Sequence, residues 1–163
     1  MQAELDTVLG GQPPTTNDLK LLPCTTQTFR EAVRLYPAAP IIPRRIEGQA
    51  ELGRYALQGP ACVMTSVYNI HRHPEFWPDP LRFDPERFGP AHSAERHRLA
   101  YVPFGAGSRM CIGNNLAMME GVLLAAVGQK YSLELLGTAP VVTRIAVTLQ
   151  SVGGIPMRLV PRR

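Results

Sequence analysis

The stretch of this sequence best suited to chemistry is "FGAGSRMCIG", which runs from Phe104 to Gly113 and sets one cysteine among three glycines. Glycines let a backbone pass close to a bulky partner, because they carry no Cβ atom and accept unusual dihedral angles. Cys111 directly precedes an expected helix, whose N-terminal N–H groups favour an anionic thiolate. Such a thiol can be inert, can attack a substrate, or can bind a metal.

A nucleophilic cysteine would need a histidine base that is held by a third group. The candidate histidines lie in charged or proline-rich segments without a local signature, so we expect surface residues or polar contacts: His71, His73, His92 and His97. The pair His71-x-His73 offers only two metal ligands, and two ligands do not close a zinc site.

The glycine loop is not expected to bind phosphate, because it lacks the Lys-Ser/Thr pair of a phosphate loop and departs from G-x-G-x-x-G spacing. Metal ligation by a single thiolate fits haem, since the porphyrin supplies the four equatorial ligands. In that interpretation the glycines lie flat under the macrocycle, Phe104 shields the sulfur from water, and the fork of Arg109 meets a propionate.

The other two cysteines, Cys24 and Cys62, sit in apolar patterns and are expected to be buried, inert thiols. Three widely spaced cysteines without a C-x-x-C motif argue against a disulfide framework and suit the reducing cytoplasm. The start "MQAELD" shows no signal peptide, and "LAMMEGVLLAAVG" is too short for a membrane span and contains Glu120. We therefore expect no membrane segment in this chain.

The composition is that of a single globular domain of 163 residues, with 45% hydrophobic and 18% charged residues. The net charge of +4 comes almost wholly from arginine, and no aromatic residues interleave with a basic run. Nucleic acid is therefore not an expected partner. A basic patch that docks an acidic protein fits the same charge, as do simply solvated arginines.

The pattern of the chain predicts the order helix, strands, coil, helix, strands. A short helix and the loop "GGQPPTT" precede a helix that begins at Pro23, ends before Pro37 and turns Phe29 and Val33 towards a core. Strands are expected from 41 to 68, and five of the sixteen prolines make 74–90 an ordered, irregular segment. A second helix spans about 114–129, stops near Gly128 and repeats apolar residues at helical spacing, followed by strands; the repeat is Leu116, Met119, Leu123 and Val127.

Glu31 and Arg34 lie three residues apart and so share one face of the first long helix. By itself such a pair is a weak surface contact. Arg87, in the "PERF" sequence of the irregular segment, offers a second guanidinium. A glutamate between two arginines would lock helix to coil if every hydrogen bond were made.

Taken together, these motifs resemble the cytochromes P-450, the haem-thiolate monooxygenases. The cysteine signature of that family, F-x-x-G-x-R-x-C-x-G with Ala and Glu further on, is matched by Phe104, Gly107, Arg109, Cys111, Gly113, Ala117 and Glu120. The sequence Glu31-Ala32-Val33-Arg34 matches the E-x-x-R helix, and Pro85–Phe88 matches the P-E-R-F coil. His73 stands where an aspartate is common in the family.

The resemblance implies a mainly α fold with small β-sheets, α+β within this chain, and an enzyme that oxidises an organic, apolar substrate with O₂. Cys111 would be the axial thiolate of haem b, which favours O–O cleavage, and the other cofactor-binding residues would be Phe104, Gly105, Gly107, Arg109, Gly113, Ala117 and Arg44, with Arg45 as a rival of Arg44. Glu31, Arg34 and Arg87 would form a structural triad. The substrate pocket would be lined by 38–42 and 150–153, and a ferredoxin or flavoprotein would donate electrons near Arg109.

The resemblance also implies that residues 1–163 are the C-terminal part of a single domain. The N-terminal helices of the family and its central oxygen-handling helix do not occur in this sequence. The chain alone is therefore expected to be inactive as an enzyme. Two alternatives stay open: a truncated, non-catalytic haem-binding or vestigial protein, and an enzyme with a cysteine nucleophile.

Overall fold

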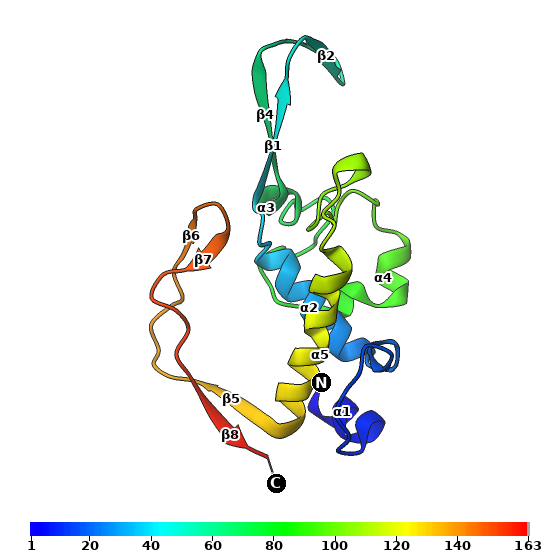
Figure 1. The fold of residues 1–163 in the computed structure, drawn as a ribbon, viewed down its shortest axis with the longest axis vertical. Helices are drawn as coiled ribbons and strands as arrows, with labels where there is room; N and C mark the ends of the chain where they lie inside the picture. Colours follow the sequence, from blue (N-terminus) through cyan, green and yellow to red (C-terminus); the bar gives the residue numbers. More distant parts are fainter. Residues whose placement is uncertain (163) are drawn as a thin grey trace.

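The computed structural model describes residues 1–162 and shows a helical body from which two β-hairpin arms extend (Figure 1). The body opens with α1 (Gln2–Leu9), the 3₁₀ turn η1 (Asp18–Leu21) and α2 (Pro23–Leu35). Proline at the first position of α2 suits a helix start, because the missing N–H group would have no partner there. The predicted order of elements and the fold class, mainly α with small sheets, are confirmed.

The first arm contains four short strands that form two antiparallel pairs. Strand β1 (Ile41–Ile46) pairs with β4 (Ala61–Ser66), and β2 (Gln49–Leu52) pairs with β3 (Tyr55–Gln58). The short helix α3 (Val67–Ile70) follows β4 and returns the chain to the end of α2 (Figure 1). The arm therefore begins and ends beside the helical body.

The proline-rich segment is ordered and irregular, as the sequence predicts, and contains the 3₁₀ turn η2 (Pro85–Phe88) before α4 (Pro90–Ala94). Trp77 and Phe88 are buried here with Ala100, and Phe76 and Tyr101 pack against this cluster. A second apolar cluster joins α1 to the long helix α5 (Asn114–Lys130). The core is thus divided between two small clusters.

The second arm follows α5 along one side of the body (Figure 1). Strand β5 (Tyr131–Leu135) pairs with β8 (Met157–Pro161), and β6 (Thr143–Ile145) pairs with β7 (Leu149–Ser151). Arg162 joins Asp6 of α1 at 2.6 Å, so the far end of the chain is tied to its beginning. Among residues 1–162, no helix is both long and apolar enough to cross a membrane.

The prediction that Phe29 and Val33 form the buried face of α2 is wrong. Its buried residues include Glu31, Arg34 and Leu35, whereas Phe29 and Val33 are only partly buried. The apolar side chains turn instead towards a cavity, because the buried charges of the same helix take the contacts with the proline-rich segment.

The apolar repeat of α5 likewise faces outwards, with Leu116 69% and Leu123 67% exposed. The helix packs through its small residues instead. A Cβ atom on Gly121 would lie 3.4 Å from Leu19 Cδ2, and one on Gly128 would lie 2.9 Å from the Met1 side chain. The sequence suggested that the helix stops near Gly128, but α5 continues to Lys130. The missing side chain of Gly128 lets α1 pack closely against α5.

Candidate functional site

The loop that carries Cys111 is held in a closed shape by its own backbone. The N–H of Cys111 donates to the carbonyl of Phe104 at 2.9 Å, and the 3₁₀ turn η3 (Gly107–Arg109) lies between them. Gly105 and Gly107 have φ angles of 74° and 73°, in the left-handed region that favours glycine. The two glycines are therefore required by the turn that presents Cys111.

Cys111 is a free, exposed cysteine two residues before the cap of α5. The carbonyl of the cap residue, Gly113, accepts the first helical hydrogen bond from Ala117 at 2.9 Å. A Cβ atom on Gly113 would lie 3.6 Å from the Cys111 sulfur, an ordinary contact distance. The start of α5 therefore fixes the position of the Cys111 thiol.

The thiol opens onto a cavity of about 530 Å³ between α2, β1 and the cysteine loop. Volumes of this order are common for cofactor sites. The cavity brings together most of the cofactor-binding residues predicted from the sequence: Arg44, Phe104, Gly105, Arg109, Cys111 and Ala117. Glu120 also lines the cavity, while Gly107 and Gly113 support the loop without lining it.

Two arginines at this cavity come from opposite walls, Arg44 from β1 and Arg109 from η3. Neither takes part in an ion pair among the described residues. The side chain of Arg45 lies on the opposite face of β1, because successive residues of a strand alternate between faces, and it pairs with Glu47 at 2.7 Å. The geometry therefore favours Arg44 over its neighbour for any anionic group in the cavity.

The apolar wall of the cavity comes from α2 and the turn that follows it. Phe29, Val33 and Tyr36 line it, together with Ala38 and Ile42 of the expected substrate segment. The other expected substrate segment, 150–153, is not among the lining residues. It lies in and after β7, whose first residue donates its N–H to the carbonyl of Ala38 at 3.1 Å.

Glu31 is fully buried between two arginines. Arg34, also fully buried, donates two hydrogen bonds to its carboxylate, at 2.6 and 2.8 Å, and Nε of Arg87 lies 3.6 Å from Oε1. The N–H of Asp84 adds a further bond at 2.9 Å. Arg34 also donates to the carbonyls of the irregular segment, so α2 and this coil are joined by buried, hydrogen-bonded charge.

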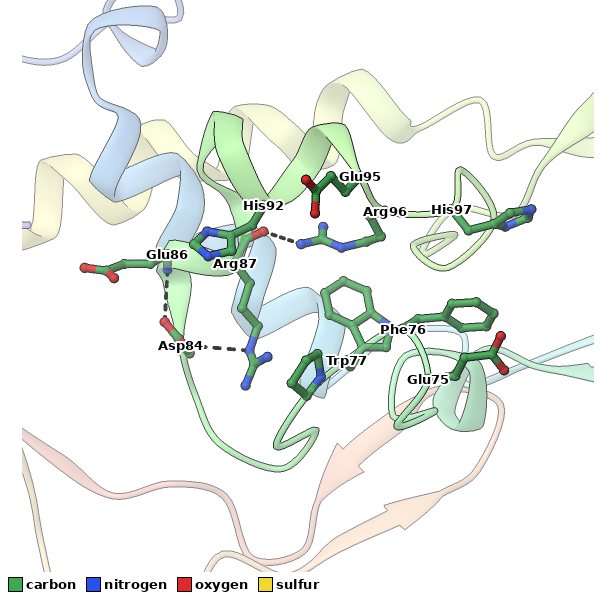
Figure 2. Close-up of a pocket in the computed structure, with 11 residues that line it drawn as sticks. Glu75, Phe76, Trp77, Asp84, Glu86, Arg87, His92, Glu95, Arg96 and His97 are labelled. Atoms are coloured by element: carbon green, nitrogen blue, oxygen red, sulfur yellow. Dashed lines mark hydrogen bonds and ion pairs between the residues drawn. The ribbon is translucent and has the colours of Figure 1, made fainter.

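Beside this ion pair lies a more polar pocket of about 400 Å³, shown in Figure 2. Arg96 donates to the carbonyl of Arg87, and its guanidinium carbon lies 4.2 Å from the centre of the Trp77 ring. Asp84 faces Arg87 at 4.0 Å. Burial lowers the pKa of Arg96 below its usual value. This pocket is built around the structural ion pairs and lies apart from Cys111.

Of the two alternatives expected for the histidines, His71 is a polar contact and not a surface residue, since its exposed fraction is zero. Its ring bonds the carbonyl of Arg34 at 3.1 Å and the N–H of Val102 at 2.9 Å. Burial lowers its pKa to about 4, with the nearby charges of Arg34 and Arg72 acting in the same direction. No local pattern predicts this burial, because the hydrogen-bond partners of His71 lie 31 and 37 residues away in the sequence.

The expectation that Cys62 is buried is wrong, because Cys62 is exposed on β4. Cys24 is only partly buried. Across the described part of the chain, no group of three or more histidine, cysteine or acidic side chains is placed to hold a metal ion.

Comparison with known proteins shows the family. The model of the family described as Cytochrome P450 matches residues 1–152. The protein LUTEIN DEFICIENT 5 of Arabidopsis thaliana is 34% identical over 99% of this chain and 28% of its own length. Cyclooctatin synthase of Streptomyces melanosporofaciens is 36% identical over 99% of this chain and 35% of its own length.

Among solved structures, the haem domain of cytochrome P450DA superposes with a TM-score of 0.88 at 28% identity, over 99% of this chain and 36% of that domain. The chain thus belongs to the cytochrome P450 family. Members of this family are oxidoreductases that bind haem through a cysteine thiolate and use small-molecule substrates and redox partners. The chain spans about a third of the length of the curated relatives it matches.

The residues present fit a haem group. A single accessible thiol faces a cavity with one apolar wall, and two arginines without carboxylate partners among the described residues flank it. Glycines at 105 and 107 hold the backbone in a conformation that side chains with a Cβ atom rarely adopt. This set of donors matches a ligand with one metal and peripheral carboxylates.

Proposed function

We propose that this chain is the haem-binding part of a monooxygenase that oxidises an organic, apolar substrate. The observation that carries the proposal is the cavity that places Cys111 between Arg44 and Arg109. When bound, haem with a thiolate ligand supplies the one-electron chemistry that activates O₂. The residues of the chain then serve to bind, orient and shield that group.

Each residue has a distinct part in this proposal. Cys111 would supply the thiolate ligand, because it is exposed at the cavity and lies two residues before the cap of α5. Phe104 lines the same cavity and, with haem bound, would shield the sulfur from water. Arg44 and Arg109 would pair with the propionates, and Phe29 and Val33 would contact the macrocycle or an apolar substrate.

The proposal also covers the electron donor and the cellular compartment. A ferredoxin or flavoprotein would dock on the side of the cysteine loop, where exposed Arg109 offers positive charge to an acidic partner. Three free cysteines suit a reducing compartment such as the cytoplasm.

We further propose that residues 1–163 work as the C-terminal part of one domain. The apolar repeat of α5 supports this proposal, because its four side chains are exposed to solvent. An exposed apolar patch of this kind is typical of a surface that another polypeptide covers. The match to only about a third of the length of the relatives also supports this proposal. Leu123→Asn should leave the unfolding free energy of the chain nearly unchanged, yet weaken assembly with a polypeptide that carries the remaining helices of a relative.

The open cavity favours a second candidate, a haem-binding protein that does not oxygenate. Among residues 1–162, the apolar face of α5 is exposed and the cavity is open to solvent. Supplying haem, an electron donor and O₂ separates the two functions. Formation of an oxidised product from an apolar substrate supports the monooxygenase, whereas haem binding without product supports the second candidate.

The test of the haem site is a titration with haem, followed by quenching of the single tryptophan, Trp77. We expect saturable binding that weakens in Cys111→Ser and in a variant with Arg44→Gln and Arg109→Gln. Cys62→Ser is the matched control, because it removes another exposed thiol away from the cavity. Equal affinity in all four proteins would refute the site.

A further inference from the structure

His71 lies at the meeting point of three segments that are far apart in the sequence. It follows α3, its Nδ1 faces the carbonyl of Arg34 near the end of α2, and its Nε2 faces the N–H of Val102. The end of α2 and α3 lie beside each other in Figure 1. The side chain is fully buried, so water does not compete for these two bonds.

The hydrogen-bond partners define which ring nitrogen carries the proton. A backbone N–H only donates, so Nε2 must accept from Val102. Nδ1 then carries the proton and donates to the carbonyl of Arg34. Both bonds are made only by the neutral ring in this one tautomer, since a charged ring would present a second donor to the N–H of Val102.

The contact at Val102 continues to the cysteine loop through the backbone. The carbonyl of Val102 accepts from the N–H of Gly105 at 3.0 Å, and the carbonyl of Phe104 accepts from the N–H of Cys111 at 2.9 Å. Val102 is therefore held on both sides, by His71 and by the first turn of the loop. Three hydrogen bonds, joined by short stretches of backbone, thus connect the ring of His71 to the backbone of Cys111.

The surroundings of the ring keep it neutral and fixed. Arg34 from α2 and the neighbouring Arg72 both place positive charge near it, and the ring of Tyr101 stacks on it at 5.2 Å. Trp77 approaches edge-on at 6.5 Å. Arg72 donates to the carbonyl of Leu35, so two consecutive residues bind the last two carbonyls of α2.

We propose that His71 is a positioning residue for the thiol of Cys111: its neutral ring links the end of α2 to Val102 and so fixes where the cysteine loop starts. The link to the backbone of the loop stands on its own, and its consequence for a thiolate ligand rests on the function proposed above. Glu31 and Arg34 would then hold α2 in place, while His71 transmits that placement to the loop.

The test compares two amide substitutions that mimic different nitrogens of the ring. The amide of glutamine reaches the place of Nε2 and can accept from Val102, whereas that of asparagine lies near Nδ1 and falls short of it. His71→Asn should raise amide hydrogen exchange at Val102 by about tenfold, the effect of one lost hydrogen bond. His71→Gln should stay close to the wild type, as should His73→Gln at a histidine whose side chain is 53% exposed.

A second readout reports on the thiol without any haem. In a background with Cys24→Ser and Cys62→Ser, the rate of alkylation measures Cys111 alone. We expect His71→Asn to raise this rate severalfold, with rescue by His71→Gln. Equal rates in the two variants would overturn the positioning role, even if Val102 exchanges faster. If haem binds, the thiolate band in the CO spectrum should follow the same order; failure of haem binding in the wild type would count against the proposed function only.

A measurement on the wild-type protein covers the case in which the variants do not fold. The nitrogen chemical shifts of His71 distinguish the two neutral tautomers. The proposal requires the proton on Nδ1 at neutral pH. A proton on Nε2, or a charged ring, would remove the acceptor for Val102 and overturn the proposal.

Discussion

The substitution Glu31→Gln tests whether buried charge holds the helical body together. In the structure, Glu31 and Arg34 are both fully buried and lie 2.6 Å apart, so removing one charge leaves the other buried without a counterion. Breaking a buried pair in this way costs about 3 to 5 kcal/mol. Whole domains are stable by only about 5 to 15 kcal/mol, so the loss should be obvious.

The assay is urea unfolding monitored by the fluorescence of Trp77, which is the single tryptophan, is 1% exposed, and stacks with Arg34 at 4.9 Å. Glu134→Gln is the matched control, because its partner Arg158 lies 3.9 Å away and both side chains are more than half exposed. An exposed pair of this kind contributes less than about 1 kcal/mol.

A milder variant keeps the reasoning testable if Glu31→Gln does not fold. Arg87 lies 3.6 Å from the same carboxylate, farther than Arg34, and its side chain is 11% exposed. Arg87→Lys keeps the positive charge and should cost less than Glu31→Gln, yet more than the control. A loss in Glu31→Gln no greater than that in Glu134→Gln would refute the account of the triad.

Three further outcomes follow from single features of the structure. The pKa of His71 is lowered from 6.5 to about 4, so the unfolded chain binds a proton between these pH values more readily than the native state does. The unfolding free energy should therefore fall by about 3 kcal/mol from pH 6.5 to pH 4, and this fall should be smaller in His71→Gln. An equally steep fall in that variant would contradict the role of His71. Gly59→Ala places a Cβ atom 2.7 Å from three backbone atoms and should destabilise the first arm by about 1 to 3 kcal/mol, seen as faster hydrogen exchange in β1 and β4, whereas Gly48→Ala meets nothing within 4 Å and should not. Gly107→Ala forces a side chain into a φ of 73° and should cost about 1 to 2 kcal/mol in thermal unfolding, with weaker haem binding; an unchanged melting temperature would contradict the strain.

Local patterns in the sequence predicted much of the fold and much of the cavity. Phe104, Arg109 and Cys111 lie within eight residues, so one loop motif was enough to expect them together. The element order followed from proline and glycine positions, which restrict the backbone directly. The β1 register then separated Arg44 from Arg45, which the sequence had left as rivals.

Features that depend on distant partners were not predictable in this way. The exposed apolar repeat of α5 has the same helical spacing as a buried repeat would have. The spacing therefore predicts a helix, but it does not show what covers the apolar face. The buried role of His71 requires the carbonyl of Arg34 and the N–H of Val102, and neither is a side-chain property. Cys62 lies in an apolar strand and is nevertheless exposed, because an apolar pattern does not define which face of a strand is covered.

The most direct test of the central claim is the absorption spectrum of the reduced, CO-bound protein after reconstitution with haem, recorded for the wild type, Cys62→Ser and Cys111→Ser. Thiolate ligation by Cys111 predicts a strongly red-shifted Soret band in the first two proteins and its loss in the third. A red-shifted band that survives in Cys111→Ser, or that Cys62→Ser abolishes equally, would contradict the assignment of Cys111 as the ligand.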